Sequence, residues 1–361
     1  MGNRRAKTIL HLISSFDSSE TKRVLGAILP RLDEYAPCVI AFRGRTPDAA
    51  LSIGREVALE SHFSGEKTFR AAAWLLRERI RPSVVHVWDS QLAATGVRLA
   101  KIFRAKSVAF VDECDPWIFD SARGALAADA ALFAQDAVRK FHARCVSARA
   151  SKWESLPHFV ELPSNLSRTR EEILEALELP KDALLIGCAG PPRAWKRWKW
   201  AIWSIDSIVR VHPTARLVFL CDSRGTQAEE RVVRETQLFA RQYERENIVR
   251  FSAAYEEILP HLDVFWNLQS TPGAARSMLE AGGAGVPIVT TDAALGDDFL
   301  PLETLHIIPT LGETLAAARA THGVLHRPQE TQEKSAQLRQ FIAKRYSLDA
   351  YLKRLREIYE R

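Results

Sequence analysis

The sequence lacks the patterns that mark several common classes of protein. No apolar run is long enough to span a bilayer as a helix. The five cysteines are scattered and form no CxxC pair, so neither a zinc site nor a disulfide framework is indicated. GxxxxGK(S/T), HExxH and GxSxG are absent, which leaves P-loop phosphoryl transfer, zinc proteolysis and a serine-hydrolase elbow without support.

The beginning of the sequence shows no secretory signal. It is basic, but the apolar run that follows is too short and too soon interrupted for a signal peptide. Together with the cysteine pattern, this favours a reducing environment. We therefore expect a cytoplasmic protein.

The composition is that of a soluble globular protein. Apolar residues make up 47% and charged residues 26% of the 361 residues, a length sufficient for two α/β domains. The net charge of +6 is compatible with a phosphate-bearing ligand, an anionic membrane face or nucleic acid, and equally with a solvated basic surface.

Short apolar runs alternate with helical segments in both halves of the chain. In the first half we expect strands at residues 8–14, 38–42, 84–88, 107–111, 130–133 and 159–162, with helices at 23–32 and 68–79. After a break at residues 163–167 we expect a helix at 170–179 and strands at 184–189, 217–221, 248–251, 264–268 and 288–291. This alternation predicts an α/β fold with two doubly wound parallel sheets.

The last segment reads as an amphipathic helix. Ser347 is a plausible N-cap. The apolar residues after it share one helical face: Leu348, Tyr351, Leu352, Leu355, Ile358 and Tyr359. We expect three parts, namely domains at residues 1–165 and 166–346 and a separate helix at 347–361.

Residues 280–292 are the most informative stretch of the sequence. They read as a helix end, a glycine stop at Gly285, a Val-Pro turn and a β-branched strand. This segment resembles the donor-binding element of the family 4 retaining glycosyltransferases, which have two Rossmann-like domains facing a cleft (the GT-B type). The resemblance implies that residues 1–165 form the acceptor side, that residues 166–346 bind a nucleotide sugar, and that the last helix crosses back to the first domain. It also implies that Glu280 holds the ribose of the donor. The alternative interpretation of Glu280 is an ordinary exposed carboxylate on a helix.

The resemblance extends upstream, to the start of the same helix. Members of the family hold the donor diphosphate with backbone amides there, which implies that role for Gly273, Ala274 and Ala275. Unpaired N–H groups and the helix dipole favour an anion at such a position. The family's first glutamate is absent, because Pro272 occupies its place.

A second motif runs from Gly190 to Lys196 and follows the strand at residues 184–189. In the resembled family a glycine-arginine pair and a lysine neutralise the diphosphate here. Lys196 matches the lysine, Pro191 replaces the arginine, and Arg193 is near enough to substitute for it. The alternative interpretation is a solvated basic loop. Asp222 follows the next strand and either lines the nucleotide pocket or caps a turn.

The first half departs most from the resembled family. Residues 17–20 replace its glycine-rich loop, and Cys114 stands about where it has a histidine that contacts the sugar. Asp115, one of three nearby acids, could orient a sugar hydroxyl, or the acids could be solvated in a turn. We expect His86 to be a packed histidine rather than a catalyst.

Four tryptophans occur between residues 195 and 203. Trp198, Ile202, Ile205 and Val209 have helical spacing, which predicts core positions. Trp195 and Trp200 do not fit that face. They could stack on a base or sugar, lie at a membrane interface, or simply pack.

The expected function is transfer of a sugar from a nucleotide-diphosphate sugar to an acceptor hydroxyl, with retention of configuration. We expect no metal, because no acidic pair of the DxD kind stands out, and no cofactor, because the nucleotide sugar is a substrate. The expected partners are a nucleotide sugar and a carbohydrate or glycolipid acceptor, with peripheral contact to an anionic inner membrane face. Rival hypotheses are a binding subunit that has lost catalysis, and an epimerase or hydrolase on the same fold. Nucleic-acid binding ranks last.

Overall fold

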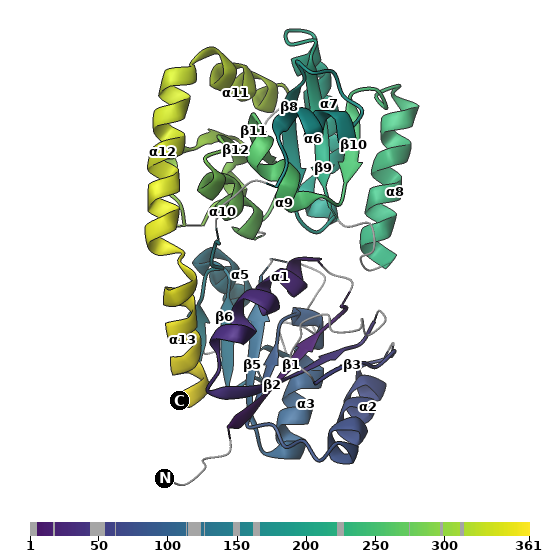
Figure 1. The fold of residues 1–361 in the computed structure, drawn as a ribbon, viewed down its shortest axis with the longest axis vertical. Helices are drawn as coiled ribbons and strands as arrows, with labels where there is room; N and C mark the ends of the chain where they lie inside the picture. The colour runs from purple at the N-terminus through teal and green to yellow at the C-terminus, as the bar shows by residue number, and fades with distance from the viewer. Residues whose placement is uncertain are drawn as a thin grey trace. The chain divides into compact units, whose positions relative to one another are not determined.

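The computed structural model describes residues 6–16, 19–43, 55–61, 63–112, 114, 124–125, 127–146, 152–161, 167–221, 227–273, 275–296, 299–310 and 314–361. The chain forms two compact units (Figure 1). Unit 1 comprises Met1–Pro157 and Leu348–Arg361, and unit 2 comprises His158–Ser347. The sequence places the boundary at 165/166, whereas the chain contacts place it eight residues earlier.

Unit 1 is built on a seven-stranded parallel sheet in the order β3-β2-β1-β4-β5-β6-β7. Its strands are β1 (Lys7–Ile13), β2 (Tyr35–Ala41), β3 (Glu56–Ala58), β4 (Val84–Val87), β5 (Lys106–Val111), β6 (Ala130–Phe133) and β7 (Trp153–Ser155). Its helices are α1 (Ser19–Ile28), α2 (Ser64–Arg77), α3 (Ala93–Phe103), α5 (Asp136–Val146) and α13 (Leu348–Glu360), with short 3-10 turns η1 (Leu29–Arg31) and η2 (Ser90–Leu92).

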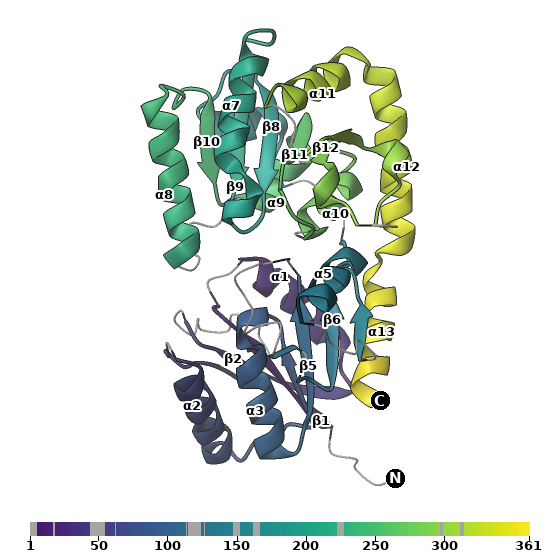
Figure 2. The same cartoon turned by 180° about the vertical axis from the view of Figure 1, so that it is seen from behind.

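Alternating side chains along the strands of unit 1 give the sheet two buried faces. Leu10 and Leu12 of β1 pack with α2 and α3, which lie side by side (Figure 2). Ile13 faces the other way and packs with α1. The sheet is therefore covered on both sides, as an all-parallel sheet requires.

Unit 2 is built on a six-stranded parallel sheet in the order β10-β9-β8-β11-β12-β13. Its strands are β8 (Leu184–Ala189), β9 (Ala215–Leu220), β10 (Val249–Ser252), β11 (Val264–Asn267), β12 (Ile288–Thr291) and β13 (His306–Ile308). Its helices are α6 (Arg170–Ala176), α7 (Trp198–Val209), α8 (Gln227–Gln242), α9 (Tyr255–Ile258), α10 (Ala275–Ala284), α11 (Thr314–His326) and α12 (Pro328–Arg345). The 3-10 turns are η3 (Ala194–Lys196), η4 (Leu259–His261), η5 (Asp292–Ala294) and η6 (Leu302–Thr304).

The strand order fixes where a ligand site is expected in each unit. In unit 2 the order reverses between β8 and β11, and in unit 1 between β1 and β4. Loops leave the carboxyl ends of such neighbouring strands in opposite directions, so a crevice opens between them. The two motifs singled out in the sequence of unit 2 follow β8 and β11.

Several strand predictions are confirmed, and one is wrong. The strands predicted at 184–189 and 288–291 are β8 and β12, and Gly285 has the positive φ of 85° that a glycine stop implies. Residues 159–161 form no strand. The last strand of the sheet in unit 1 is instead β7, and the aromatic ring of Phe159 is buried. β3 and β13 were not predicted, and α1 begins four residues before the predicted start at residue 23.

The expected C-terminal helix is α13, and it belongs to unit 1. The six residues predicted to share its apolar face are the six that are buried. Tyr359 shares a 2.6 Å hydrogen bond with His86 Nδ1, and Arg354 pairs with Glu154. The prediction that this helix returns to the first domain is confirmed.

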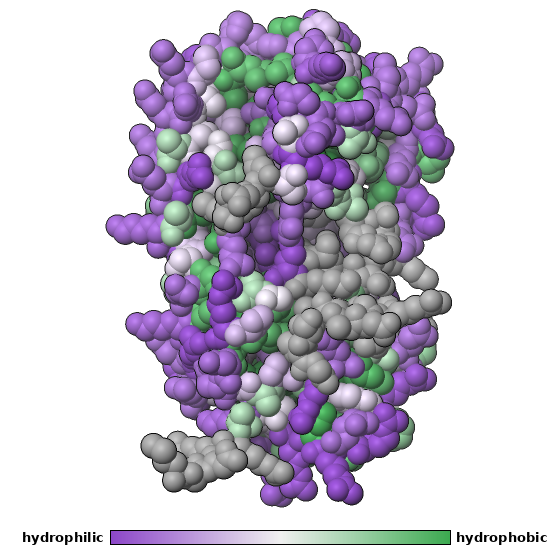
Figure 3. Space-filling view, in the orientation of Figure 1, coloured by the Kyte–Doolittle hydropathy of each residue, from purple (hydrophilic) through white to green (hydrophobic). Residues whose placement is uncertain are grey.

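None of the helices in the described part of the chain combines the length and the apolar content needed to span a bilayer. On the face of the molecule seen in Figure 3, hydrophilic residues predominate and hydrophobic residues are interspersed among them.

Candidate active site at the carboxyl ends of β8 and β11

Two loops at the switch point of unit 2 are hydrogen-bonded to each other. One follows β8 and contains Gly190 and η3, and the other follows β11 and leads to α10. The backbone N–H of Ser270 donates to the carbonyl of Trp195 at 2.9 Å, and the Ser270 hydroxyl contacts the same carbonyl at 3.4 Å. The structure thus brings together the two segments that the sequence marks as the diphosphate site.

Lys196 lies at the centre of this arrangement. It is only 4% exposed, and its Nζ lies 3.1 Å from the point where a Cβ on residue 190 would stand. Gly190 has a φ of 104°, a backbone conformation that favours glycine, and a Cβ at this position would make a tight contact with the ammonium. The hydroxyl of Ser277, on the first turn of α10, lies 3.7 Å from the same point. The ammonium therefore approaches the start of α10.

The beginning of α10 supplies the second feature of an anion site. The helix starts at Ala275, directly after a loop in which Gly273 adopts a φ of 139°. Gln269, which is fully buried, donates from Nε2 to the Gly273 carbonyl and so holds the loop in place. Amides in the first turn of a helix have no acceptor within it, and the helix dipole adds a partial positive charge. Lys196 and the start of α10 can together bind an anion such as a diphosphate.

Glu280 lies one turn further along α10 and is 9% exposed. Its Oε1 accepts a 2.8 Å bond from Nε of Arg276, and its Oε2 accepts a 2.6 Å bond from the hydroxyl of Tyr255. A carboxylate oxygen can accept more than one hydrogen bond, which is the chemistry that a pair of ribose hydroxyls requires. The carboxylate is held in one orientation before any ligand arrives.

Arg276 is itself enclosed. Its guanidinium carbon lies 5.6 Å from the ring centre of Phe159. Burial, together with the positive charge of Arg276, lowers the pKa of His158 to about 3. His158 is therefore neutral at physiological pH, and Glu280 is the anionic partner that compensates the buried guanidinium.

Arg193 is placed less favourably for a phosphate. Its Nη2 pairs with Glu229 Oε1 on α8 at 3.0 Å, and the two side chains are 23% and 12% exposed. The guanidinium would have to share its donors between that carboxylate and a ligand. Three other predicted site residues, namely Asp115, Ala274 and Asp222, lie outside the described residues.

The tryptophans near η3 divide as the helical spacing indicates. Trp198 is 3% exposed and packs on Phe219, with ring centres 4.7 Å apart, so the core prediction is confirmed. Trp200 is half-buried, and the guanidinium carbon of Arg197 lies over its ring, 4.6 Å from the ring centre. Trp195 contributes the backbone carbonyl that accepts from Ser270.

Sequence reasoning missed Arg276 and Ser277 as members of the site. Arg276 stands four residues before Glu280, a spacing that places two side chains on one helix face and could have revealed the pair. The hydrogen bond from Tyr255 to Glu280 joins residues 25 positions apart, so no local sequence pattern predicts it. Among the described residues, no group of three or more histidine, cysteine or acidic side chains is arranged to bind a metal ion.

The corresponding switch point of unit 1 has a different character. Cys114 is fully buried in the core with Val111 and Phe133, so its thiol is a packing group. The prediction that His86 is a packed histidine is confirmed, since it is fully buried against Tyr359. At the strand ends, the Ser14 hydroxyl donates to Asp89, which also caps η2.

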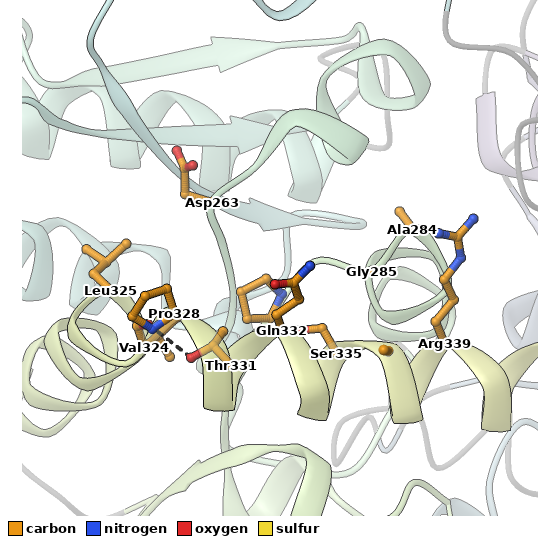
Figure 4. Close-up of a pocket in the computed structure, with 12 residues that line it drawn as sticks. Asp263, Ala284, Gly285, Val324, Leu325, Pro328, Thr331, Gln332, Ser335 and Arg339 are labelled. Carbon is orange, nitrogen blue, oxygen red and sulfur yellow. Dashed lines mark hydrogen bonds between the residues drawn. The ribbon is translucent and has the colours of Figure 1, made fainter.

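Two pockets lie at the opposite, amino-terminal edges of the sheets. The pocket of unit 2 has a volume of about 480 Å³ and is lined by residues of α12, the end of α11 and the turn before β12 (Figure 4). Asp263 and Pro287, which precede β11 and β12, are among its lining residues. A pocket of unit 1 is lined by Lys106, Asp129 and Lys152. Neither pocket contains a residue of the candidate site.

Comparison with known proteins identifies the fold. A scan against protein-family models finds no match, and neither does a search of curated proteins. Among solved structures, the Anabaena protein HepE in complex with UDP-glucose matches with a TM-score of 0.81 at 15% identity, over 98% of this chain and 99% of its own. The sucrose-phosphate synthase of Thermosynechococcus elongatus matches with a TM-score of 0.78 at 14% identity, over 98% of each chain. A glycosyltransferase from Rickettsia africae matches with a TM-score of 0.74 at 13% identity, over 99% of this chain and 98% of its own.

The fold of this chain is therefore the two-domain GT-B fold of glycosyltransferases. The resemblance predicted from residues 280–292 is confirmed at that level, whereas assignment to family 4 stays a prediction.

Proposed function

We propose that the protein is a glycosyltransferase that moves a sugar from a nucleotide-diphosphate sugar to an acceptor hydroxyl with retention of configuration. One observation carries this proposal. The buried Lys196 ammonium lies close to the start of α10, and both lie beside Gly190, which has no side chain. A buried cation beside a helix N-terminus suits a leaving diphosphate, whose negative charge grows as the glycosidic bond breaks. HepE, which shares the fold, was solved with UDP-glucose, so a uridine diphosphate is the first ligand to test.

In this proposal each side chain has a definite task. Lys196 stabilises the diphosphate, the amides at Gly273 and Ala275 bind its oxygens, and Glu280 accepts from the ribose hydroxyls. Arg193 assists if it releases Glu229. The bond from the sugar C1 to the phosphate oxygen breaks, and a bond from the acceptor oxygen to C1 forms on the same face. The acceptor's proton passes to an oxygen of the departing diphosphate, so the mechanism requires neither a protein base nor a metal.

One rival function has a specific observation in its favour. Pro272 replaces the first glutamate of the resembled family, and the described part of unit 1 offers a buried Cys114 in place of a sugar-contacting histidine. Both departures affect the sugar end and leave the diphosphate end intact. A protein of this kind would bind the nucleotide but transfer nothing, and would serve as a binding subunit.

The deciding experiment separates binding from turnover. Calorimetry with uridine, guanosine and adenosine diphosphates should find one that binds, and Lys196→Ala should weaken it about tenfold or more, because a charge-assisted hydrogen bond contributes on the order of 1.5–3 kcal/mol. The matched control is Lys199→Ala, a lysine whose side chain is 47% exposed and paired with Glu235, which should bind normally.

The outcomes distinguish the candidates. Equal affinity of both variants would contradict the proposed diphosphate site. Binding without turnover of any matching sugar nucleotide would favour the binding subunit. Turnover abolished by a chelator and restored by magnesium or manganese would refute the metal-free mechanism.

A further inference from the structure

We propose that one face of α2 in unit 1 docks on an anionic membrane surface. The inference is independent of the proposed transferase activity, because it rests on a surface that contains none of the candidate site residues. The notable feature is a helix that is apolar on two sides. One side packs against the sheet, and the other side faces solvent.

The inward side of α2 needs no further partner. Thr68, Ala71 and Leu75 are buried, and Ala71 and Leu75 belong to the core that fills this face of the sheet. Their spacing is that of one helical stripe. Packing within unit 1 therefore explains why this side of α2 is apolar. It does not explain the apolar residues on the opposite side of the helix.

The outward side carries large apolar side chains in the open. Phe69 is 74% exposed and Leu76 is 63% exposed, and the exposed Ala73 lies between them at the i+4 position of the same stripe. Phe63, directly before the helix, is 77% exposed. Single exposed apolar residues are common on proteins, but a phenylalanine and a leucine aligned along one helix face form a continuous strip.

Basic side chains accompany this strip along its length. Arg70 and Arg77 each follow a strip residue by one position and so line one edge of it, where they pair with Glu66 at 2.7 Å and with Glu78 at 3.0 Å. Arg79 and Arg81 follow the end of the helix as exposed residues and add positive charge there. At the other end, Arg98 of α3 donates to the Ser64 hydroxyl at 2.9 Å. Residues 63–81 contain five basic and two acidic side chains.

This combination fits a membrane surface better than a protein partner. An interfacial helix lies flat, inserts its apolar strip among the lipid chains, and directs lysine or arginine towards anionic headgroups. Arginine can keep its stem on apolar surface while its charge stays in water. The excess of positive charge is complementary to anionic lipid.

The test uses the full-length protein and vesicles of two compositions. Co-sedimentation with vesicles of equimolar phosphatidylglycerol and phosphatidylcholine should exceed that with phosphatidylcholine alone and should fall as salt is added. The double variant Phe69→Ser/Leu76→Ser should lower the partition coefficient roughly tenfold or more, because two apolar side chains no longer leave water. The pair Arg70→Gln/Arg77→Gln should lower it about fivefold for each charge removed.

A matched control exchanges equally exposed apolar residues elsewhere. Val211 is 60% exposed and Leu302 is 55% exposed, and Val211→Ser/Leu302→Ser should bind vesicles as the parent does. All variants change exposed positions, so thermal unfolding should be unaffected and would reveal misfolding. The proposal is overturned if the parent protein does not bind the anionic vesicles, or if the α2 variant binds them equally well. It is also overturned if the substitutions in α2 change the oligomeric state in gel filtration and leave vesicle binding unaltered.

Discussion

The two sheets have the same kind of switch point, but the two edges are built from different chemistry. At the edge of unit 2, buried charges come together: Lys196 beneath a glycine, and Arg276 paired with Glu280. At the edge of unit 1 the corresponding strands carry buried neutral rings, namely His11, His86 and the partly buried Trp88. The indole of Trp88 donates to His11 Nδ1 at 3.0 Å.

This difference distinguishes side chains that stabilise the fold from side chains that are suited to binding a ligand. Charges are costly to bury, so a fold keeps them where they have partners or a task. The charged edge of unit 2 has geometry suited to an anion. The buried rings of β1 and β4 in unit 1 serve the packing of α13, whose Tyr359 contacts His86, and the Asp89 carboxylate at these strand ends caps η2. Three substitutions or conditions test this contrast.

The largest effect is expected for Glu280→Ala. The substitution leaves the guanidinium of Arg276, whose side chain is 8% exposed, without its carboxylate. An unpaired buried charge costs about 3 kcal/mol of stability or more. Urea denaturation measures the loss. The double variant Arg276→Met/Glu280→Leu removes both charges and should be close to the parent in stability. An equal loss in the single and double variants would show that the pair is not what stabilises this edge.

A smaller effect is expected when the pH is lowered. Burial lowers the pKa of His11 to about 3 in the folded protein, against 6.5 for the exposed side chain. Above pH 6.5 both states are neutral and His11 has no effect on stability. Below pH 6.5 the His11 side chain binds a proton in the unfolded state but stays neutral in the folded state. The free energy of unfolding therefore falls by about 1.4 kcal/mol per pH unit, which amounts to about 2 kcal/mol between pH 6.5 and 5.

The His11→Gln variant isolates this contribution. Burial also lowers the pKa values of His86 and His158, so the parent protein should lose more stability than His11 alone explains. Denaturation at the two pH values should give a smaller difference for His11→Gln than for the parent. Identical pH dependence in the two proteins would mean that His11 is protonated in the folded state.

The smallest effect is expected for Tyr359→Phe. The change removes only the hydroxyl that shares a hydrogen bond with His86, which should cost about 1 kcal/mol of stability. Nucleotide binding should be unaltered, because neither residue belongs to unit 2. A loss of nucleotide affinity as large as that of Lys196→Ala would contradict the division of roles between the two edges.

The sequence predicts the regular parts of this fold well, for reasons visible in particular elements. β8 is an apolar strand that ends just before Gly190, and β12 is a run of β-branched residues that begins just after Pro287, so the composition and one end of each are marked in the sequence. The six-residue face of α13 is fully periodic. β3 and β13 have only three residues each and lie at sheet edges, too short to leave a pattern.

The sequence predicts the local elements of the candidate site but not the ion pairs and hydrogen bonds between side chains that are distant in the chain. Glycine, the helix start and Lys196 are local signals, and the structure brings them together. The bond between Arg193 and Glu229 joins residues 36 positions apart, and its existence depends on how α8 packs. Residues 159–162 resemble a strand because three of the four are apolar. Phe159 is nevertheless buried near Arg276 and does not pair with a sheet.

The path of the chain has a consequence for how the protein is assembled. Unit 2 is in effect an insertion between Pro157 and Leu348 of unit 1. During synthesis, unit 2 can finish folding once residue 347 has emerged, whereas unit 1 must wait for α13 to bring Leu355 and Tyr359. A fragment ending at residue 157 would leave the surface that α13 covers open to water, so unit 2 is the better of the two for separate expression.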